Sequence, residues 1–206
     1  MEYSTEIAED LLAIEAVQIK TKQEEYFTWT SGIKSPIYCD NRLTMSYPNV
    51  RKKIVRAFIE KMQQLPNKPD VIVGCATAGI PHAAWLAEAL DVPMAYVRSK
   101  PKGHGKGNQI EGQIFPGQKV LVIEDLISTG GSSIEAAEVL LEAGAEVLSV
   151  FAIFTYGLPK AEDAFQKAAV SFTTITGYDT LLSVLKNKNQ INDREIQELL
   201  QWRDHL

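Results

Sequence analysis

Cysteine is scarce in this chain of 206 residues, and long apolar runs are absent. The two cysteines, Cys39 and Cys75, stand in unrelated contexts without the spacing of metal ligands. A disulfide framework or a zinc site is therefore not expected, and both thiols should be reduced. No apolar run reaches the roughly 18 residues that cross a bilayer, and the acidic stretch Met1–Glu6 lacks the features of a signal peptide. We therefore expect a cytoplasmic protein that does not enter a membrane.

Positively charged residues are also fewer than negatively charged ones. The chain has 21 lysines and arginines against 26 aspartates and glutamates, a formal net charge of −5. A surface of this sign repels nucleic acids and anionic membranes, so neither is an expected partner. The Walker-type loop G-x-x-x-x-G-K-[ST] is missing as well, which argues against that kind of nucleotide site. Any anion-binding site must be a local exception to the overall charge.

From residue 70 onward, short β-branched runs alternate with helical patterns. Strands are expected at 71–73, 94–98, 120–123 and 147–154, and helices at 80–90 and 133–143. This alternation predicts an α/β fold with a central, mainly parallel sheet flanked by helices. We expect residues 1–206 to form a single domain. Its core spans roughly 46–178, and a small hood combines residues 1–45 with two C-terminal helices within 179–206.

The expected hood begins with a helix capped by Ser4 or Thr5. Its apolar positions recur at the helical period, and they are Ile7, Leu11, Ile14 and Val17. Residues 27–41 suggest two short strands joined by a turn. A helix from about Asn49 to Gln64 then leads into the core.

Residues 119–133 carry the strongest chemical signal. The run Val120–Ile123 predicts a buried strand whose end brings Glu124 and Asp125 to the carboxyl edge of the sheet. Residues 128–132 follow as a hydroxyl- and glycine-rich turn at the start of a helix, where free backbone N–H groups and the helix dipole favour a phosphate. The carboxylates suit hydroxyl groups or a metal-bound water instead. Together these features predict a phosphorylated sugar as the ligand.

A second informative region is the segment 98–112. Cationic residues alternate there with small ones, and four glycines loosen the backbone; the cationic residues are Arg98, Lys100, Lys102, His104 and Lys106. Such a flexible arm suits an anionic group such as a departing diphosphate. The alternative is a solvated hairpin tip whose charge is incidental.

The acidic pair and the turn resemble the phosphoribosyl pyrophosphate (PRPP) motif of type I phosphoribosyltransferases. Segments 27–38 and 98–105 are similar to orotate phosphoribosyltransferases in particular. The resemblance implies Mg²⁺-dependent transfer of the 5-phosphoribosyl group from PRPP to orotate, giving orotidine 5′-monophosphate and diphosphate in pyrimidine biosynthesis. It also implies a homodimer with shared active sites, in which the arm 98–112 closes over the neighbouring subunit.

The resemblance also assigns roles to individual residues. It places Arg98, Lys102 and His104 on the diphosphate in trans, and gives catalytic roles to Lys102, His104 and Asp125. It gives Phe27, Lys34 and Ser128 to orotate, and it implies that Mg²⁺ is held mainly through PRPP and not directly by the chain. The loop 74–81 resembles the pyrophosphate-binding loop of the family. In cis, the PRPP-binding residues are Glu124, Asp125, Leu126, Ile127, Ser128, Thr129, Gly130, Gly131 and Ser132.

The chain departs from some family members at four places. Lysines found elsewhere in the family are replaced here by Thr30, Ala78 and Ser99, and no arginine follows Phe154 closely. The residues that recognise the orotate carboxylate therefore stay open, as do the kinetic order, the dimer interface and regulation. Two alternatives are a phosphoribosyltransferase for a purine base and a PRPP-sensing regulator without catalysis. Segments 27–38 and 98–112 argue against the first, and the lack of a basic nucleic-acid-binding face argues against the second.

Overall fold

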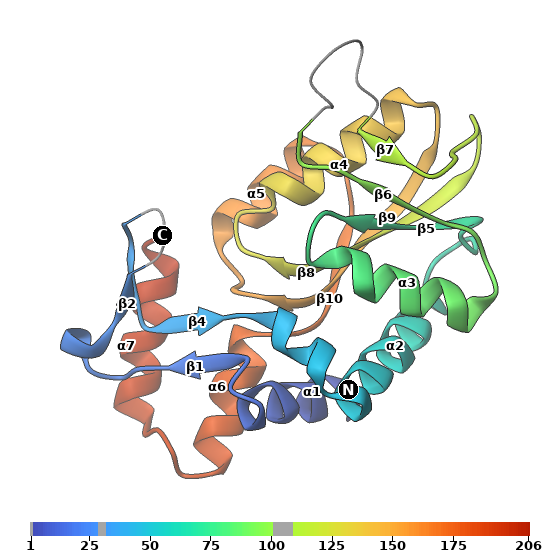
Figure 1. Ribbon diagram of the computed structural model, residues 1–206. Helices are drawn as coiled ribbons and strands as arrows, with labels where there is room; N and C mark the ends of the chain where they lie inside the picture. The colour runs from blue at the N-terminus through green and yellow to red at the C-terminus, as the bar shows by residue number, and fades with distance from the viewer. Residues whose placement is uncertain (1, 29–31, 101–108) are drawn as a thin grey trace.

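The computed structural model describes residues 2–28, 32–100 and 109–206. Its centre is a six-stranded sheet in the order β10-β9-β8-β5-β6-β7 (Figure 1). All neighbouring strands are parallel except β6 and β7, so the predicted α/β class with a mainly parallel sheet is confirmed. The strands are β5 (Val71–Cys75), β6 (Met94–Val97), β7 (Ile110–Glu111), β8 (Lys119–Ile127), β9 (Glu146–Thr155) and β10 (Phe172–Gly177).

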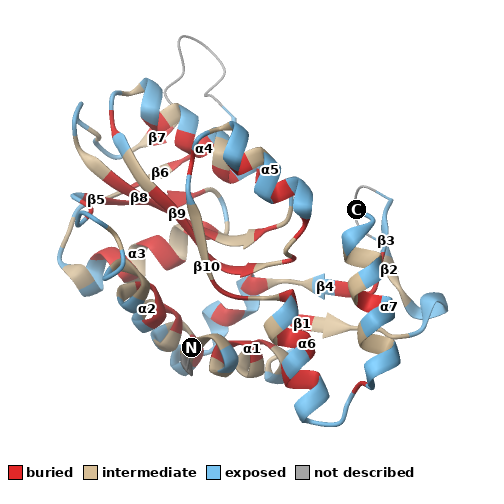
Figure 2. Ribbon diagram, turned by 180° about the vertical axis from the view of Figure 1, so that it is seen from behind, coloured by how far each residue is buried: buried red, intermediate tan, exposed pale blue. Residues whose placement is uncertain are grey.

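Helices cover both faces of this sheet. One face carries α4 (Gly131–Glu142) and α5 (Pro159–Lys167), and the other carries α1 (Glu2–Ala13), α2 (Pro48–Met62) and α3 (Gly79–Leu90) (Figures 1 and 2). Because side chains alternate along a strand, β8 feeds two separate cores. Val120 and Val122 pack in the core under α4, while Leu121 and Ile123 pack in the core under α3. This double coverage explains why the strands read as continuous apolar runs.

The hood is built from both ends of the chain. Strand β1 (Val17–Ile19) pairs with β4 (Ile37–Cys39), and β2 (Phe27–Thr28) pairs with β3 (Lys34–Ser35), both antiparallel. The C-terminal helices α6 (Tyr178–Asn187) and α7 (Asp193–Asp204) lie beside these strands (Figure 1). Trp202 of α7 donates from Nε1 to the carbonyl of Lys34 at 3.0 Å. Two short 3₁₀ helices complete the hood, η1 (Gln23–Glu25) and η2 (Asn41–Ser46).

The first helix differs from the expectation. It begins at Glu2, so that Ser4 and Thr5 lie inside it and do not cap it. It ends at Ala13, and Val17 belongs to β1. The left-handed backbone of Glu15, with φ of 58°, turns the chain out of the helix before the apolar period is complete.

Three elements of the core were not expected from the sequence. They are β7, α5 and β10. Strand β10 contains three threonines and few apolar residues, because it lies at one end of the sheet and pairs only with β9. None of the helices in the described ranges has both the length and the apolar character needed to span a membrane.

The strand order reverses beside β8, and we call the sheet edge at the carboxyl ends of β5 and β8 the crevice. The chain runs from β5 to β6 on one side and later inserts β8 on the other side of β5. Open α/β sheets bind their ligands at the carboxyl ends of strands where the order reverses in this way. The start of α3 packs tightly at this point, because a Cβ on Gly79 would collide with the carbonyl oxygen of Ile123. Glycine at position 79 therefore sets the distance between α3 and β8.

We expect Gly79→Ala to lower the free energy of unfolding by about 1–3 kcal/mol, the usual cost of forcing extra volume into a packed interior. Urea unfolding monitored by circular dichroism would measure the loss. Gly131→Ala is the matched control for stability, because a Cβ at Gly131 meets nothing within 4 Å. Equal stability of the Gly79→Ala and Gly131→Ala variants would contradict this account of the α3–β8 contact.

Candidate active site

Strand β8 has hydrogen-bonded edges of unequal length. Its pairing with β5 ends at Ile123, opposite Gly74, whereas its pairing with β9 continues to Ile127, opposite Thr155. The expectation that the strand ends at Ile123 is therefore wrong, because β9 is long enough to extend it. Glu124 and Asp125 nevertheless lie beyond the end of the β5 ladder, where β8 borders the crevice.

Glu124 faces the start of α4. Its Oε2 accepts hydrogen bonds from Ser132 Oγ at 3.1 Å and Ser133 Oγ at 3.3 Å, and its Oε1 accepts from the backbone N–H of Asp125 at 3.0 Å. The residue is only 5% exposed. Burial, and secondly the charge of Asp125, raise the pKa of this carboxyl above its usual range. Glu124 thus links the acidic pair to the turn, and Ser133 is a partner that sequence reasoning missed.

Asp125 is the more accessible member of the pair. Its side chain is partly buried, and burial raises its pKa. The guanidinium of Arg42 acts on it in the opposite direction, although Arg42 is itself paired with Asp40 through an Nε–Oδ1 contact of 2.6 Å. A carboxylate at this position can reach a ligand in the crevice without first leaving a salt bridge of its own, since no described residue forms one with it.

The turn after β8 leads directly into α4. Ser128 is partly buried, Thr129 is exposed, and Gly130 adopts the left-handed conformation with φ of 82°. A Cβ on Gly130 would lie 2.7 Å from the ring of Phe165, so two independent constraints require glycine there. No side chain caps the amino end of α4. Its first-turn N–H groups, at the positive end of the helix dipole, are therefore suited to bind an anion.

The loop after β5 brings a second helix start to the same crevice. Residues 76–78 join β5 to α3, and no side chain caps the amino end of α3. The peptide bond between Ala76 and Thr77 is cis. Because β5 and β8 are neighbours, the two uncapped helix starts lie at adjacent strand ends. This arrangement suits a ligand with anionic groups at two places.

The cationic arm is the connection of a β-hairpin. Strands β6 and β7 pair antiparallel, and the backbone N–H of Arg98 donates to the carbonyl of Gln109 at 2.8 Å. The Nη1 of Arg98 lies 3.5 Å from Oε1 of Glu111. Arg98 also lines a small cavity together with Cys75 and Ser132, so it borders the turn of its own chain. Lys102 and His104 lie outside the described residues.

The residues assigned to orotate in the hood have their contacts within the hood. The ring of Phe27 lies 5.6 Å from that of Tyr38, and Nζ of Lys34 donates to Thr28 Oγ1 at 2.8 Å. Among the described residues, no hydrogen bond, ion pair or ring contact joins Phe27 or Lys34 to Ser128. Ser128 thus lies in the turn after β8, while the interactions of the Phe27 and Lys34 side chains described above stay within the hood.

A set of buried polar residues behind the acidic pair was not found from the sequence. The side chain of Asn41, in η2, donates from Nδ2 to the backbone carbonyl of Asp125 at 2.7 Å. Thr44 Oγ1 donates to the carbonyl of Asn41 at 2.6 Å and lies 3.4 Å from Nε2 of His82 in α3. No local motif marks these residues, because the residues they contact are distant in the sequence.

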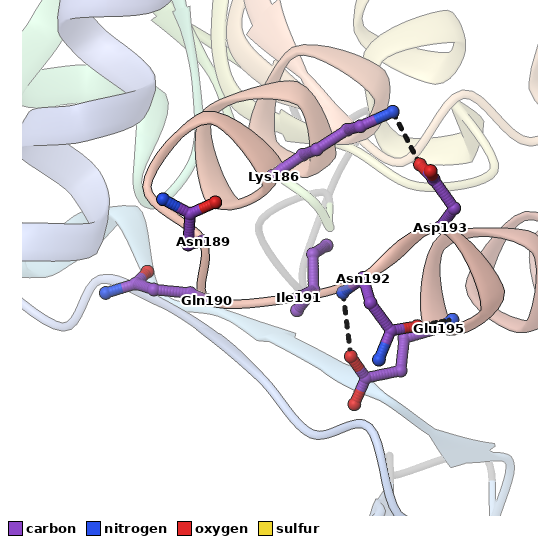
Figure 3. A pocket seen from close by; sticks show the side chains of 7 residues that line it. All are labelled: Lys186, Asn189, Gln190, Ile191, Asn192, Asp193 and Glu195. Carbon is purple, nitrogen blue, oxygen red and sulfur yellow. Dashed lines mark hydrogen bonds and ion pairs between the residues drawn. The ribbon is translucent and has the colours of Figure 1, made fainter.

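A separate hollow lies at the connection between α6 and α7 (Figure 3). Asp193 pairs there with Lys186, and Glu195 forms a capping box with Asn192. These polar groups therefore serve the helix ends. No residue that the sequence assigned to the site lines this hollow.

Comparison with known proteins identifies the chain. The family model described as a phosphoribosyl transferase domain matches residues 46–180. A curated orotate phosphoribosyltransferase from Oceanobacillus iheyensis is 62% identical over 201 residues and aligns over 98% of each chain. The chain belongs to the orotate phosphoribosyltransferase family.

Other members of the family support the same placement. The orotate phosphoribosyltransferase of Fusobacterium nucleatum is 56% identical, with 98% of this chain and 95% of that protein covered. The crystal structure of orotate phosphoribosyltransferase from Aeropyrum pernix superposes with a TM-score of 0.77 at 27% identity, covering 90% of this chain and 99% of the other. The family, the fold and the transferase class predicted from the sequence are thus confirmed.

The buried histidine behind the family's acidic motif predicts a pH effect. Burial lowers the pKa of His82 to about 4, below the value of about 6.5 for an unfolded chain. Above about pH 6.5 the protonation of His82 does not reduce the free energy of unfolding. As the pH falls from there towards the folded-state pKa, stability is lost because the unfolded chain binds the proton first. Between pH 7 and pH 5 the wild type should therefore lose about 2 kcal/mol more than His82→Gln. Urea unfolding at both pH values measures this, and parallel losses in the two proteins would contradict it.

Proposed function

We propose that this chain transfers the 5-phosphoribosyl group of PRPP to N1 of orotate, forming orotidine 5′-monophosphate and diphosphate in pyrimidine biosynthesis. The observation that carries the proposal is the crevice between β5 and β8, where an acidic pair lies between two uncapped helix starts. Relatives that are 62% and 56% identical along nearly their whole length are named orotate phosphoribosyltransferases. A phosphate, a ribose and a diphosphate together match the charges of this crevice.

The turn and the acidic pair bind the phosphoribosyl part. Residues 129–132 hold the 5′-phosphate with the first-turn N–H groups of α4 and the hydroxyl of Thr129, since the hydroxyl of Ser132 donates to Glu124. Asp125 orients the ribose hydroxyls, and its charge complements the positive charge that develops on the ribose as the anomeric bond breaks. Glu124 keeps the turn in place through Ser132 and Ser133 and is the second partner for the ribose hydroxyls.

The leaving group is bound by backbone and by cations. The loop 76–78 presents the amino end of α3 to the diphosphate, while Arg98, Lys102 and His104 neutralise the charge that grows on it. His104 donates a proton or a hydrogen bond to the departing oxygen, because imidazole titrates near neutral pH. Ser128, Phe27 and Lys34 are the proposed contacts to orotate. Catalysis then rests on positioning and electrostatic stabilisation, and no covalent nucleophile is required.

Magnesium is the proposed cofactor. Mg²⁺ keeps several waters and is commonly bound through substrate phosphates with few protein ligands. The described residues contain no group of three or more His, Cys, Asp or Glu that could hold the ion, so we propose that PRPP supplies most of its ligands. When bound, the ion neutralises part of the diphosphate charge.

We further propose that the protein acts as a cytoplasmic homodimer. Both described cysteines are free thiols, which suits a reducing compartment. The resemblance of residues 98–105 to the family's arm supports a site shared between subunits. Asp125 would then act with Lys102 and His104 of the partner subunit.

We expect orotate absorbance to fall when the protein is supplied with PRPP and Mg²⁺, and the reaction to stop when EDTA removes the ion. Excess Mg²⁺ should restore the rate. Adenine and guanine in place of orotate serve as controls and should give no product. Turnover with a purine alone would favour a purine phosphoribosyltransferase, and PRPP binding without any turnover would favour a regulator.

Mixing two inactive variants tests the shared site. Lys102→Ala removes a cation from the leaving group, and Asp125→Asn removes the charge that complements the ribosyl cation, so each variant alone should be nearly inactive. If the arm acts in trans, a mixed dimer pairs one intact arm with one intact turn. Random re-association should restore roughly a quarter of wild-type activity, since half the dimers are mixed and half their sites are intact.

Subunit exchange must be shown independently, for which native mass spectrometry of differently labelled subunits is suitable. A mixture that exchanges subunits and stays inactive would mean that the arm closes over its own chain. Arg98 and Ser132 of the same chain line one cavity, so closure of the arm over its own chain is the main alternative to a shared site.

A further inference from the structure

A buried chain of hydrogen bonds connects α3, η2 and β8 behind the acidic pair. Thr44 Oγ1 has one proton, which it donates to the carbonyl of Asn41 at 2.6 Å. The same oxygen, 3.4 Å from His82 Nε2, must therefore accept from that ring nitrogen. The side chain of Asn41 then donates to the carbonyl of Asp125 at 2.7 Å. In each of these hydrogen bonds the donor thus lies on the α3 side and the acceptor on the β8 side.

The last bond of this chain lies where the sheet stops supporting β8. The β5 ladder ends at Ile123, and Asp125 is two residues farther along the strand. The backbone carbonyl of Asp125 lies beyond the last residue of β8 that pairs with β5, and it accepts a hydrogen bond from Asn41. The amide of Asn41 thereby fixes the backbone of the residue whose carboxylate borders the crevice.

This arrangement is not the most stable way to fill the interior. Asn41 and Thr44 are fully buried and His82 is 1% exposed. Asn41 Oδ1 and His82 Nδ1 make no hydrogen bond with any described residue. Unpaired polar atoms in the interior are costly, and apolar side chains of similar shape would avoid that cost. A role in geometry accounts for polar residues at these positions better than a role in stability.

We propose that Asn41, Thr44 and His82 are positioning residues that hold the backbone at Asp125 and thereby aim its carboxylate at the ribose of PRPP. The proposal rests on the proposed function, since it concerns the same site. It assigns these residues to PRPP and not to orotate. Loss of the chain should therefore weaken PRPP binding selectively.

Thr44→Val is the most informative variant, because it keeps the shape of the side chain and removes the hydroxyl. We expect it to raise both the KM and the calorimetric Kd for PRPP on the order of tenfold, since small displacements of a positioned group are costly. The KM for orotate should change less than about twofold, since no interaction with the base is lost. Thr44→Ser keeps the hydroxyl and should restore PRPP binding. Asn41→Leu, which removes the final donor, should act in the same direction.

Ser149→Ala provides the matched control. Ser149 is 2% exposed and donates from Oγ to the carbonyl of Ser171 at 3.1 Å; it lies in β9 opposite Leu121 of β8, before the acidic pair along the strand. Ser149→Ala removes a buried hydroxyl, as Thr44→Val does, and should leave the PRPP constants unchanged. A Thr44→Val protein with wild-type PRPP constants would overturn the proposal.

The two proposals fail differently. If the wild type neither binds PRPP nor consumes orotate, the proposed function is wrong. If the wild type does both, and Thr44→Val and Asn41→Leu bind PRPP as the wild type does, only the positioning role is wrong. Should Asn41→Leu not fold, the comparison of Thr44→Val with Thr44→Ser still decides the matter, because it varies a single hydroxyl.

Discussion

Strand β8 shares a longer hydrogen-bonded edge with β9 than with β5, and the acidic pair depends on this difference for its support. The β5 ladder stops at Ile123, whereas pairing with β9 holds the strand extended to Ile127. The residues between these points are held by β9 without a partner in β5. Asn41 bonds to the carbonyl of Asp125 there, and the side chain of Asp125 stays partly exposed while Glu124 is buried. A rigid support of this kind is what a positioned carboxylate requires.

The electrostatics of the site oppose those of the whole chain. A net charge of −5 and a buried acidic pair would repel a phosphorylated ligand. The two uncapped helix starts offer partial positive charge from backbone N–H groups, and the proposed function adds the cations of the arm. Glu124 is bonded to Ser132 and Ser133, so the turn proposed to bind the phosphate also holds the nearer carboxyl.

The hood and the core meet at η2. Asn41 bonds to β8 and Thr44 approaches α3, so this short helix touches both elements that border the crevice. Strand β4 of the hood leads directly into it. Through η2, the part of the chain that resembles a base-covering segment is connected to the part that resembles a PRPP site. The two halves of the proposed reaction therefore share a structural support.

Much of this protein follows from local sequence patterns. The alternation of β-branched runs with helical periods predicted the parallel sheet, and residues 119–133 predicted the acidic pair and the turn, because each of these signals lies within a short stretch of chain. Strand β10 was missed because an edge strand needs few apolar residues, and the end of β8 was misplaced because the length of its neighbour decides it. Ser133 was missed although it lies only nine positions from its partner Glu124. Asn41, Thr44 and His82 carry no local signature. Their roles depend on contacts between residues far apart in the sequence, such as the 84 positions that separate Asn41 from Asp125, and only the packing of η2 and α3 against β8 brings such residues together.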